Sequence, residues 1–295
     1  MPRSVRLADR AVLRVSGPDA RGLLQGIVTN DMERVAPARA IWAALLTPQG
    51  KYLHDFMIAQ DAEGFLFDAD AARLAELKKR LAMYRLRAKV TIEEQPGLAV
   101  FALWDADAAA RCGLADAPGA AAPWQNGIAF VDPRLAALGA RAILPADAAA
   151  AAALQSAGFA AAKPGEYERH RIALGVPDGA RDLVADKSYP MENGFDALNG
   201  IDFAKGCYVG QEVTARMKHR GLVKKRLFPV AIEGDPPPPG TAVRRGAVDA
   251  GELRGAAGGI GLALLKLDQA FADDAAPLTA GDARLTPRKP AWMAE

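Results

Sequence analysis

Alternating hydrophobic and polar residues dominate the N-terminal third of the chain. An alternation with a period of two is typical of strands that bury one face in a core. It predicts strands at residues 11–17, 64–70 and 88–94, and a pair of strands around a Pro-Gln-Gly turn within 40–60.

Two helices are predicted among these strands. Residues 19–27 form the first, and Ser16 and Asp19 at its start have the spacing of a capping box. Residues 71–84 form the second. One face of this helix carries Leu74, Leu77, Leu81 and Tyr84. Hairpins are mixed with helices instead of alternating regularly with them, so the pattern indicates an α+β fold.

A second α+β unit is predicted between residues 98 and 175. Its expected strands lie at 98–104, 127–132 and 140–145. Its expected helices cover 146–158 and 163–175, and a glycine lies at the end of each.

The clearest boundary is the proline-rich segment 233–240. Its four consecutive prolines exclude a helix or a central strand and favour a stiff connector. Short strand-like pieces with many glycines follow, which predicts a small antiparallel barrel. We therefore expect an α+β domain over 1–232, with subdomains of about 1–97 and 98–232, and a barrel domain over 241–295.

Composition narrows the function classes. The chain has 295 residues, of which 51% are hydrophobic, and a net charge of +2, so any basic site has to be local. No apolar run is long enough to span a bilayer, and no membrane partner is expected. The basic N-terminus lacks the apolar stretch of a secretory signal, and strand-like alternation already begins by Val5. A mitochondrial presequence is therefore set aside, and a cytoplasmic location is predicted.

The segment IDFAKGCYVGQEVTARMKHRG, residues 201–221, contains one of the two cysteines. A thiol reacts as thiolate, and the ammonium group of Lys205 could favour that form of Cys207 if the turn brings the two together. Gly206 and Gly210 permit a loop that presents the thiol. The polar neighbours favour partial exposure, although free cysteines are often simply buried. Burial is expected of Cys112, which has no such neighbours.

Three kinds of thiol chemistry can be compared. A cysteine hydrolase needs a thiol–imidazole pair, and none of the three histidines lies in a recognisable signature. A closed zinc site and a stable iron–sulfur cluster each normally need four ligands, which two cysteines cannot supply, and no metal ligands are predicted. A single thiolate that shares or moves a cluster together with a partner remains possible.

The motif KGCYVGQE, residues 205–212, resembles the signature of the YgfZ family. These folate-binding proteins are related to the T-protein (aminomethyltransferase) of the glycine cleavage system, and residues 188–221 look especially like their mitochondrial iron–sulfur assembly branch. The resemblance covers most of the chain, including the segments 15–32 and 259–268. Residues 100–160 carry little of it.

The resemblance implies a three-part ring of α+β subdomains closed by a barrel, with tetrahydrofolate or a derivative in a central cavity. It implies that Cys207 and Lys205 are the reactive residues. The rest of the motif loop would be Gly206, Tyr208, Gly210, Gln211 and Glu212. Folate contacts would come from Asp55, Tyr84, Arg171 and Glu192, each of which could also have an ordinary structural role.

The implied function is that of an accessory factor that makes or repairs iron–sulfur clusters in client enzymes, including a radical tRNA-modifying enzyme. Its partners would be reduced folate, assembly proteins and clients, with a cluster shared transiently. Two alternatives stay open: a folate-dependent one-carbon transferase and a docking scaffold without enzymatic activity. The T-protein's RLEAG reads RIALG at 171–175, and its Asp-Asp pair reads His54-Asp55. One missing acid therefore argues against full T-protein chemistry, and whether any reaction is catalysed is left open.

A basic run occupies residues 216–226 and holds six Lys or Arg residues. Strand alternation could explain part of it, with Leu222 pointing inward. The run could also bind the acidic tail of a folate, since Arg suits carboxylates. No aromatic stacking motif of an RNA-binding module is present, so direct nucleic-acid binding is not expected.

Overall fold

The computed structural model describes residues 1–272 and 276–293 and divides into two compact units. The first unit comprises Met1–Leu46, Leu53–Tyr167 and Asn199–Val209, and the second comprises Thr47–Tyr52, Glu168–Leu198 and Gly210–Glu295. The domain bounds expected from the sequence stay a prediction, and a few positions of the expected range 241–295 lie outside the described residues.

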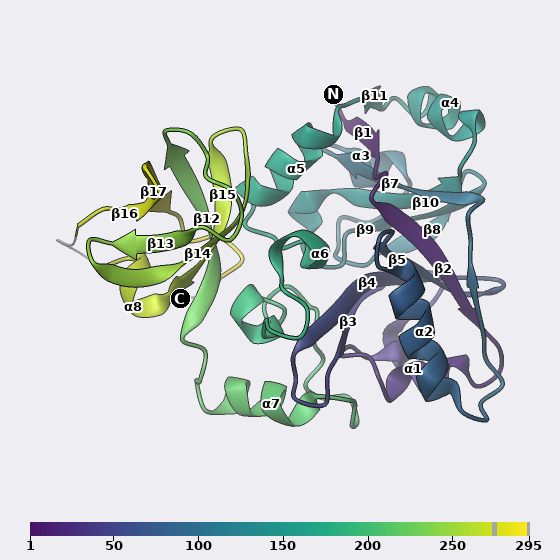
Figure 1. The fold of residues 1–295 in the computed structure, drawn as a ribbon. Helices are drawn as coiled ribbons and strands as arrows, with labels where there is room; N and C mark the ends of the chain where they lie inside the picture. The colour runs from purple at the N-terminus through teal and green to yellow at the C-terminus, as the bar shows by residue number, and fades with distance from the viewer. Residues whose placement is uncertain (273–275, 294–295) are drawn as a thin grey trace. The chain divides into compact units, whose positions relative to one another are not determined.

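One sheet of the first unit has the strand order β3-β4-β5-β2-β6 (Figure 1). Its strands are β2 (Arg10–Ser16), β3 (Ile41–Leu46), β4 (Tyr52–Asp61), β5 (Gly64–Asp70) and β6 (Thr91–Glu94). The alternation predicted these strands because every second side chain of each enters one core. In β5, for example, Phe65, Phe67 and Ala69 lie in that core, whereas Asp68 lies on the opposite face.

The helices α1 (Ala20–Gln25) and α2 (Leu74–Arg85) contribute to the same core, and η1 (Met32–Arg34) follows α1. Leu74, Leu77 and Leu81 are buried there, and Tyr84 packs against them half-buried, as the helical period predicts. The predicted capping box is wrong. Asp19 precedes α1 without capping it, because its carboxylate instead accepts the backbone N–H of Lys89 at 2.7 Å.

The other sheet of the first unit has the order β11-β1-β7-β10-β9-β8. Its strands are β1 (Arg3–Arg6), β7 (Leu98–Trp104), β8 (Ala121–Trp124), β9 (Gly127–Val131), β10 (Ala140–Pro145) and β11 (Ala160–Ala161). The helices α3 (Ala108–Arg111) and α4 (Ala148–Ser156) pack on one face and share its core, and η2 (Ala136–Leu138) precedes β10. The N-terminal strand β1 therefore pairs within this sheet, beside β7.

The second unit contains a closed antiparallel barrel with the order β12-β15-β14-β13-β16-β17 (Figure 1). Its strands are β12 (Lys225–Glu233), β13 (Ala242–Arg245), β14 (Val248–Ala257), β15 (Ile260–Lys266), β16 (Leu278–Ala280) and β17 (Ala283–Pro287), and α8 (Leu267–Ala270) follows β15. β12 precedes the proline-rich segment, so this segment lies inside the barrel sequence. The α+β class and the C-terminal antiparallel barrel are confirmed.

Short helices precede the barrel in the sequence. They are α5 (Pro164–Ala173), α6 (Gly179–Asp182), η3 (Pro190–Asn193) and α7 (Gln211–His219). Strand structure holds only for the end of the basic run, where β12 begins at Lys225. Residues up to His219 form α7, and the expectation for Leu222 is wrong because its side chain is 48% exposed instead of pointing inward. Within the described residues, the helices are too short or too polar to cross a membrane.

Candidate functional site

The segment before Cys207 is fixed to residues 28–30 of the first unit by hydrogen bonds. Thr29 Oγ1 donates to the carbonyl of Gly200 at 2.7 Å, and Asn30 Nδ2 donates to the carbonyl of Asn199 at 2.7 Å. The backbone N–H of Asp202 donates to the carbonyl of Thr29 at 3.0 Å. These contacts involve backbone groups of both segments. They therefore fix the position of residues 199–202, which lead into the motif.

Lys205 anchors the motif itself. Its side chain is buried, and Nζ donates to the carbonyls of Val28 and Asn30, both at 2.7 Å. Burial lowers the pKa of Lys205 to about 8, and the nearby carboxylates of Asp31 and Asp202 oppose that shift. The ammonium group is therefore committed to two backbone acceptors, and its influence on the thiol stays a prediction.

Cys207 is exposed, as its polar neighbours predict, while Lys205 and Tyr208 beside it are buried. Val209 packs against the core that α1 and α2 cover. Cys112 is buried, also as predicted, and burial raises the pKa of its thiol to about 12. The chain thus holds one accessible thiol on an anchored loop and one inert thiol in a core.

The remaining motif residues have separate roles. Gly210 takes a left-handed backbone, with φ of +84°, immediately before α7, a conformation that favours glycine. Gly206 lies in open space without such a backbone, so the structure does not require glycine there. Gln211 begins α7, and Glu212 is exposed with its carboxylate 3.4 Å from Arg216. These last residues shape the exit from the motif.

Asp55 lies in β4 and is buried rather than solvated. Its Oδ2 accepts a hydrogen bond from Trp42 Nε1 at 3.0 Å, and the guanidinium of Arg134 lies 5.7 Å from the centre of the Trp42 ring. His54, the neighbouring residue, points elsewhere: its Nε2 is 3.7 Å from Glu76 on α2. Burial, assisted by the charge of Arg73, lowers the pKa of His54 to about 4 and keeps it neutral.

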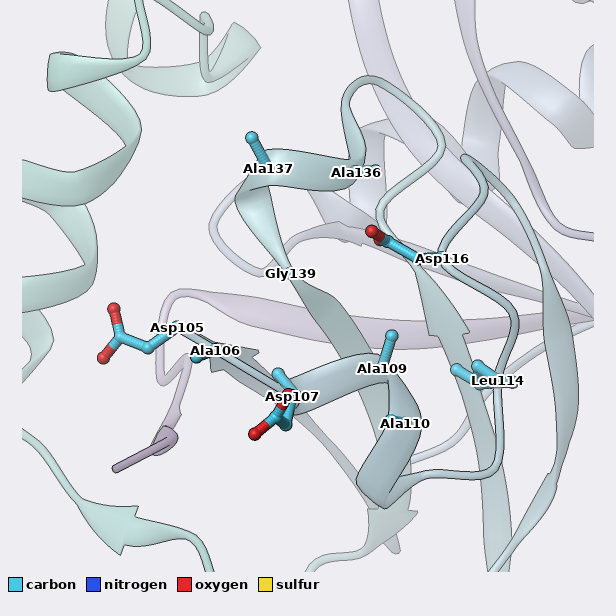
Figure 2. Close-up of a pocket in the computed structure, with 11 residues that line it drawn as sticks. Asp105, Ala106, Asp107, Ala109, Ala110, Leu114, Asp116, Ala136, Ala137 and Gly139 are labelled. Atoms are coloured by element: carbon cyan, nitrogen blue, oxygen red, sulfur yellow. The ribbon is translucent and has the colours of Figure 1, made fainter.

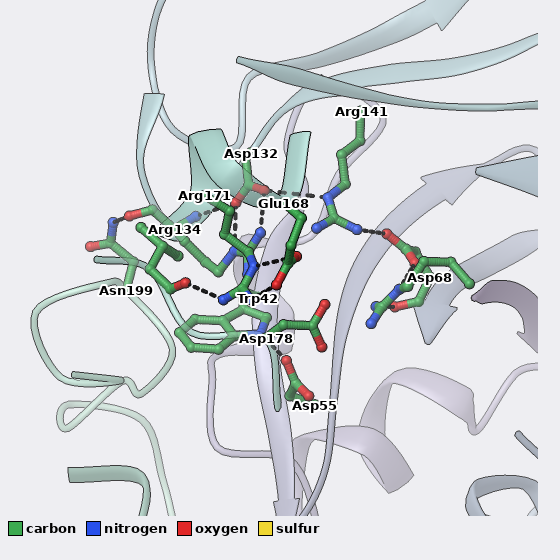
Figure 3. Close-up of polar contacts among 12 residues, drawn as sticks. Trp42, Asp55, Asp68, Asp132, Arg134, Arg141, Glu168, Arg171, Asp178 and Asn199 are labelled. Carbon is green, nitrogen blue, oxygen red and sulfur yellow. Dashed lines mark hydrogen bonds and ion pairs between the residues drawn. The ribbon is translucent and has the colours of Figure 1, made fainter. Parts of the chain in front are cut away.

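A buried network of arginines and aspartates joins the two sheets of the first unit (Figure 3). Asp68 of β5 binds Arg10 at 2.6 Å and also binds Arg141 of β10. Arg141 in turn contacts Asp132 at 3.3 Å, and Asp132 binds Arg134 at 2.7 Å. Arg134 then lies against Trp42, the partner of Asp55. The network therefore reaches from β2 to the residue that orients the Asp55 carboxylate.

Arg171 is buried in the second unit, and its guanidinium is almost fully used within this chain (Figure 3). Nε and Nη2 donate to Glu168, and Nη1 donates to Asp182 and to the carbonyl of Val176, both at 2.6 Å. Burial opposes the charge, but the carboxylates of Asp182 and Glu168 outweigh it and raise the pKa of Arg171. One N–H remains at most, so the side chain is poorly suited to anchor a ligand.

Glu192 of η3 fits a ligand better. Its carboxylate is half-buried, burial raises its pKa, and the charges of Lys225, Lys51 and Arg254 oppose that shift. Within the described residues its carboxylate makes no hydrogen bond or ion pair, whereas its backbone N–H donates to the carbonyl of Tyr189 at 3.1 Å. A half-buried carboxylate acceptor without a donor suits the N–H groups of a pterin. The folate contacts implied for Asp55 and Glu192 stay predictions, and Tyr84 mainly packs against the core.

A pocket of about 590 Å³ lies beside α3 in the first unit. Figure 2 shows the carboxylates of Asp105, Asp107 and Asp116 among its alanines. None of the residues predicted to act lines this pocket, and Arg3 already binds Asp105. In the described part of the chain, no group of three or more His, Cys, Asp or Glu could hold a metal ion.

Sequence reasoning missed Thr29, Asn30 and Asp202, which position the motif loop. Their only local signal is a polar Thr-Asn pair directly after the apolar residues Ile27 and Val28. Their partners are more than 160 residues away in the sequence, so a local pattern could not identify them.

Two comparisons identify relatives of this chain. The model of the CAF17 C-terminal β-barrel domain matches residues 224–295. The mitochondrial iron–sulfur cluster assembly factor IBA57 of Homo sapiens is 36% identical over 286 residues, which cover 88% of this chain and 76% of that protein. This chain belongs to the IBA57 family. The protein of the same name from Mus musculus is 35% identical over 288 residues, with the same shares covered.

The resemblance to a mitochondrial iron–sulfur assembly branch agrees with these relatives, which are named as mitochondrial iron–sulfur cluster assembly factors. Membership of YgfZ itself stays a prediction. The predicted cytoplasmic location is wrong, because the relatives from Homo sapiens, Mus musculus and Neurospora crassa are all named as mitochondrial. The sequence argument failed because it weighed only a secretory signal and the early strand pattern, and neither identifies the compartment.

A solved structure shares the fold. The glycine cleavage system aminomethyltransferase T from Bartonella henselae superposes with a TM-score of 0.79 over 99% of this chain and 86% of that chain. Its sequence identity is 14%, so the match shows the fold alone. The predicted aminomethyltransferase-like architecture with its C-terminal barrel is thereby confirmed.

Proposed function

We propose that this chain is an iron–sulfur cluster assembly factor that uses Cys207 and binds a reduced folate. The first part is supported by its relatives, which are named as assembly factors and align over most of the chain. Its partners are then iron–sulfur assembly proteins and the client enzymes that receive clusters, and a tRNA-modifying enzyme is one such client.

The exposed thiol on its anchored loop carries the proposal. Cys207 is exposed between the buried residues Lys205 and Tyr208, on a segment held by Thr29 and Asn30. As thiolate it donates an electron pair to an iron of a cluster that a partner presents, the bond from that iron to one ligand of the partner breaks, and the thiol proton goes to solvent. The cluster is cargo, and the iron changes ligands without changing its oxidation state.

Tetrahydrofolate is the proposed ligand because the family resemblance implies it and because Glu192 offers a half-buried carboxylate without a donor. Asp55, the other carboxylate that the resemblance implies, is buried within its own unit and accepts a hydrogen bond from Trp42. Carboxylates of this kind bind the amino and ring N–H groups of a pterin. Arg171 contributes by holding Glu168 and Asp182 in place rather than by contact with the ligand.

Replacing Cys207 tests the thiol. Cys207→Ala should impair iron–sulfur enzymes in cells, including tRNA modification by a cluster-dependent enzyme, while leaving the thermal unfolding of the protein unchanged. Cys112→Ala is the matched control, since it removes the other thiol without touching the loop. Normal enzyme activities in cells that carry Cys207→Ala would refute the role of the thiol.

Calorimetry with tetrahydrofolate tests the ligand. A one-site isotherm weakened by Glu192→Gln supports folate binding, and no heat of binding would leave a docking scaffold as the function. The alternative of a one-carbon transferase is favoured by the retained carboxylate of Asp55. Incubation with tetrahydrofolate and methylamine donors decides it, because methylene-folate above background would establish transfer.

A further inference from the structure

Two large apolar side chains, Met83 near the end of α2 and Leu86 directly after it, point to solvent. The buried face of α2 consists of Leu74, Leu77 and Leu81. On the opposite side Met83 is 68% exposed, and Leu86 at the end of the helix is 88% exposed. The exposed Lys79 lies one turn before Met83 on the same side. Met83 and Leu86 are more exposed than any other large hydrophobic side chain of the described residues except Met1.

The backbone of Leu86 is strained as well. Its φ of +44° and ψ of −108° lie in a region that side chains other than glycine rarely adopt. The loop around it is firmly held, since the N–H of Lys89 donates to Asp19 and the N–H of Ala88 donates to the carbonyl of Arg85. Hydrogen bonds of the surrounding loop hold Leu86 in this strained conformation, with its apolar side chain in water. Strain that is maintained in this way points to a function.

The charge around Met83 and Leu86 has one sign. Residues 77–92 contain six Lys or Arg residues and no Asp or Glu. Lys78 pairs with Glu94 and Arg80 pairs with Glu76. In contrast, the side chains of Lys79, Arg87 and Lys89 form no ion pair or hydrogen bond with any described residue. This region therefore combines two exposed apolar side chains with unpaired cations. A partner surface that matches it has an apolar hollow surrounded by acidic groups.

Three occupants could supply negative charge. Nucleic acid would satisfy the cations, but it would leave Met83 and Leu86 without partners, and the aromatic residue of this helix, Tyr84, packs against the core instead of offering its ring for base stacking. A helix that lies in an anionic membrane inserts its apolar face, whereas the apolar face of α2 is buried in the core and only Met83 and Leu86 remain exposed. An acidic protein surface can satisfy both the unpaired cations and the exposed apolar side chains. Methionine and leucine fill apolar hollows, and methionine adapts to their shape.

We infer that Lys79, Met83, Leu86 and Arg87 form the centre of a docking surface for an acidic protein partner. This surface, the exposed end of α2 and the two residues that follow it, stands on its own geometry and does not depend on the role of Cys207. It predicts affinity that needs both the apolar side chains and the cations.

Fluorescence anisotropy with the full-length chain tests this surface. The probe is a synthetic helical peptide of about 18 residues with a leucine stripe flanked by glutamates. We expect binding that weakens as salt is raised from about 50 to about 300 mM. Met83→Ser with Leu86→Ser, and separately Lys79→Glu with Arg87→Glu, should each weaken it about tenfold. Val248→Ser with Arg244→Glu, exposed residues of the barrel, is the matched control and should bind normally.

Three results would overturn the inference. The first is absence of peptide binding to the unmodified chain. The second is equal binding of a peptide in which serines replace the leucines, because charge alone would then explain it. The third is binding of vesicles with anionic lipid, or of an RNA oligonucleotide, that disappears in the same variants while peptide binding persists. Cys207 is intact in every variant, so failure here is distinct from failure of the proposed function.

Discussion

At the scale of single residues, Cys207 is exposed while both Lys205 and Tyr208 are buried. The buried neighbours fix the backbone on either side, so the thiol can meet a partner without a rearrangement of the loop. Fixing a reactive group before the encounter reduces the ordering cost that binding would otherwise carry.

Alkylation should distinguish the two thiols. Iodoacetamide needs an accessible thiolate, and burial raises the pKa of Cys112 to about 12. We expect a single adduct, at Cys207, under native conditions and two adducts in denaturant, measured by mass spectrometry. The variant Cys207→Ser should give no native adduct. Comparable rates at Cys112 and Cys207 would show that the core around Cys112 opens readily.

Lys205 should make stability depend on pH. Its pKa is about 8 in the folded chain and its ordinary value is 10.5, so between these values the unfolded chain holds a proton that the folded chain has released. The free energy of unfolding therefore rises with pH across this window. Below the window Lys205 is protonated in both the folded and the unfolded chain, so it adds no pH dependence there. Relative to Lys205→Met, the unmodified protein should gain of order 2 kcal/mol between about pH 7.5 and pH 10.5 in urea titrations. Parallel pH profiles for the two proteins would contradict the buried ammonium.

Exposure of Cys207 could be predicted from the sequence, but the partners of Lys205 could not. The polar residues around Cys207 are a local signal for exposure. Lys205 binds carbonyls that are 177 and 175 residues away, and a carbonyl belongs to every residue type, so no residue pattern marks it.

At the scale of elements, the buried charges between the two sheets fix how the strands of the first unit face one another. Asp68 receives both Arg10 and Arg141, so one carboxylate links β2, β5 and β10. Removing one member of a buried ion pair leaves its partner uncompensated.

Asp68→Asn should therefore destabilise the protein by about 3 kcal/mol. The matched control is Glu94→Gln, which breaks an exposed pair with Lys78 and should cost under about 1 kcal/mol. Chemical denaturation curves measure both. Equal small effects would mean that water or a shifted side chain replaces the lost carboxylate.

Local patterns predicted most elements, and the exceptions have a physical reason. The hairpin strands β3, β4 and β5 follow from alternation because their partners are adjacent in sequence. Helix α7 was missed because its polar and basic residues give no apolar stripe beyond the buried Thr214 and Met217. The strand β1 pairs with β7, about a hundred residues later, and short strands with distant partners carry little local signal.

At the scale of the whole molecule, the candidate folate residues belong to both compact units: Asp55 to the first and Glu192 to the second. The family resemblance named them as a set, whereas composition and periodicity could not, because isolated carboxylates are ordinary surface residues in any sequence. The structure adds that each is held in a partly or fully buried environment.

Ligand-linked stability should separate the thiol from the folate site. A ligand that binds only the folded chain stabilises it by about 2.7 kcal/mol at a hundred times its dissociation constant. We expect tetrahydrofolate to stabilise the unmodified protein and Cys207→Ser equally. Glu192→Gln keeps the shape of the side chain but removes the charged acceptor, so a tenfold weaker affinity would reduce that stabilisation by about 1.4 kcal/mol. Differential scanning calorimetry over a range of ligand concentrations measures the effect in all three proteins. If Cys207→Ser loses the stabilisation while Glu192→Gln keeps it, the thiol belongs to the folate site and the carboxylate of Glu192 does not.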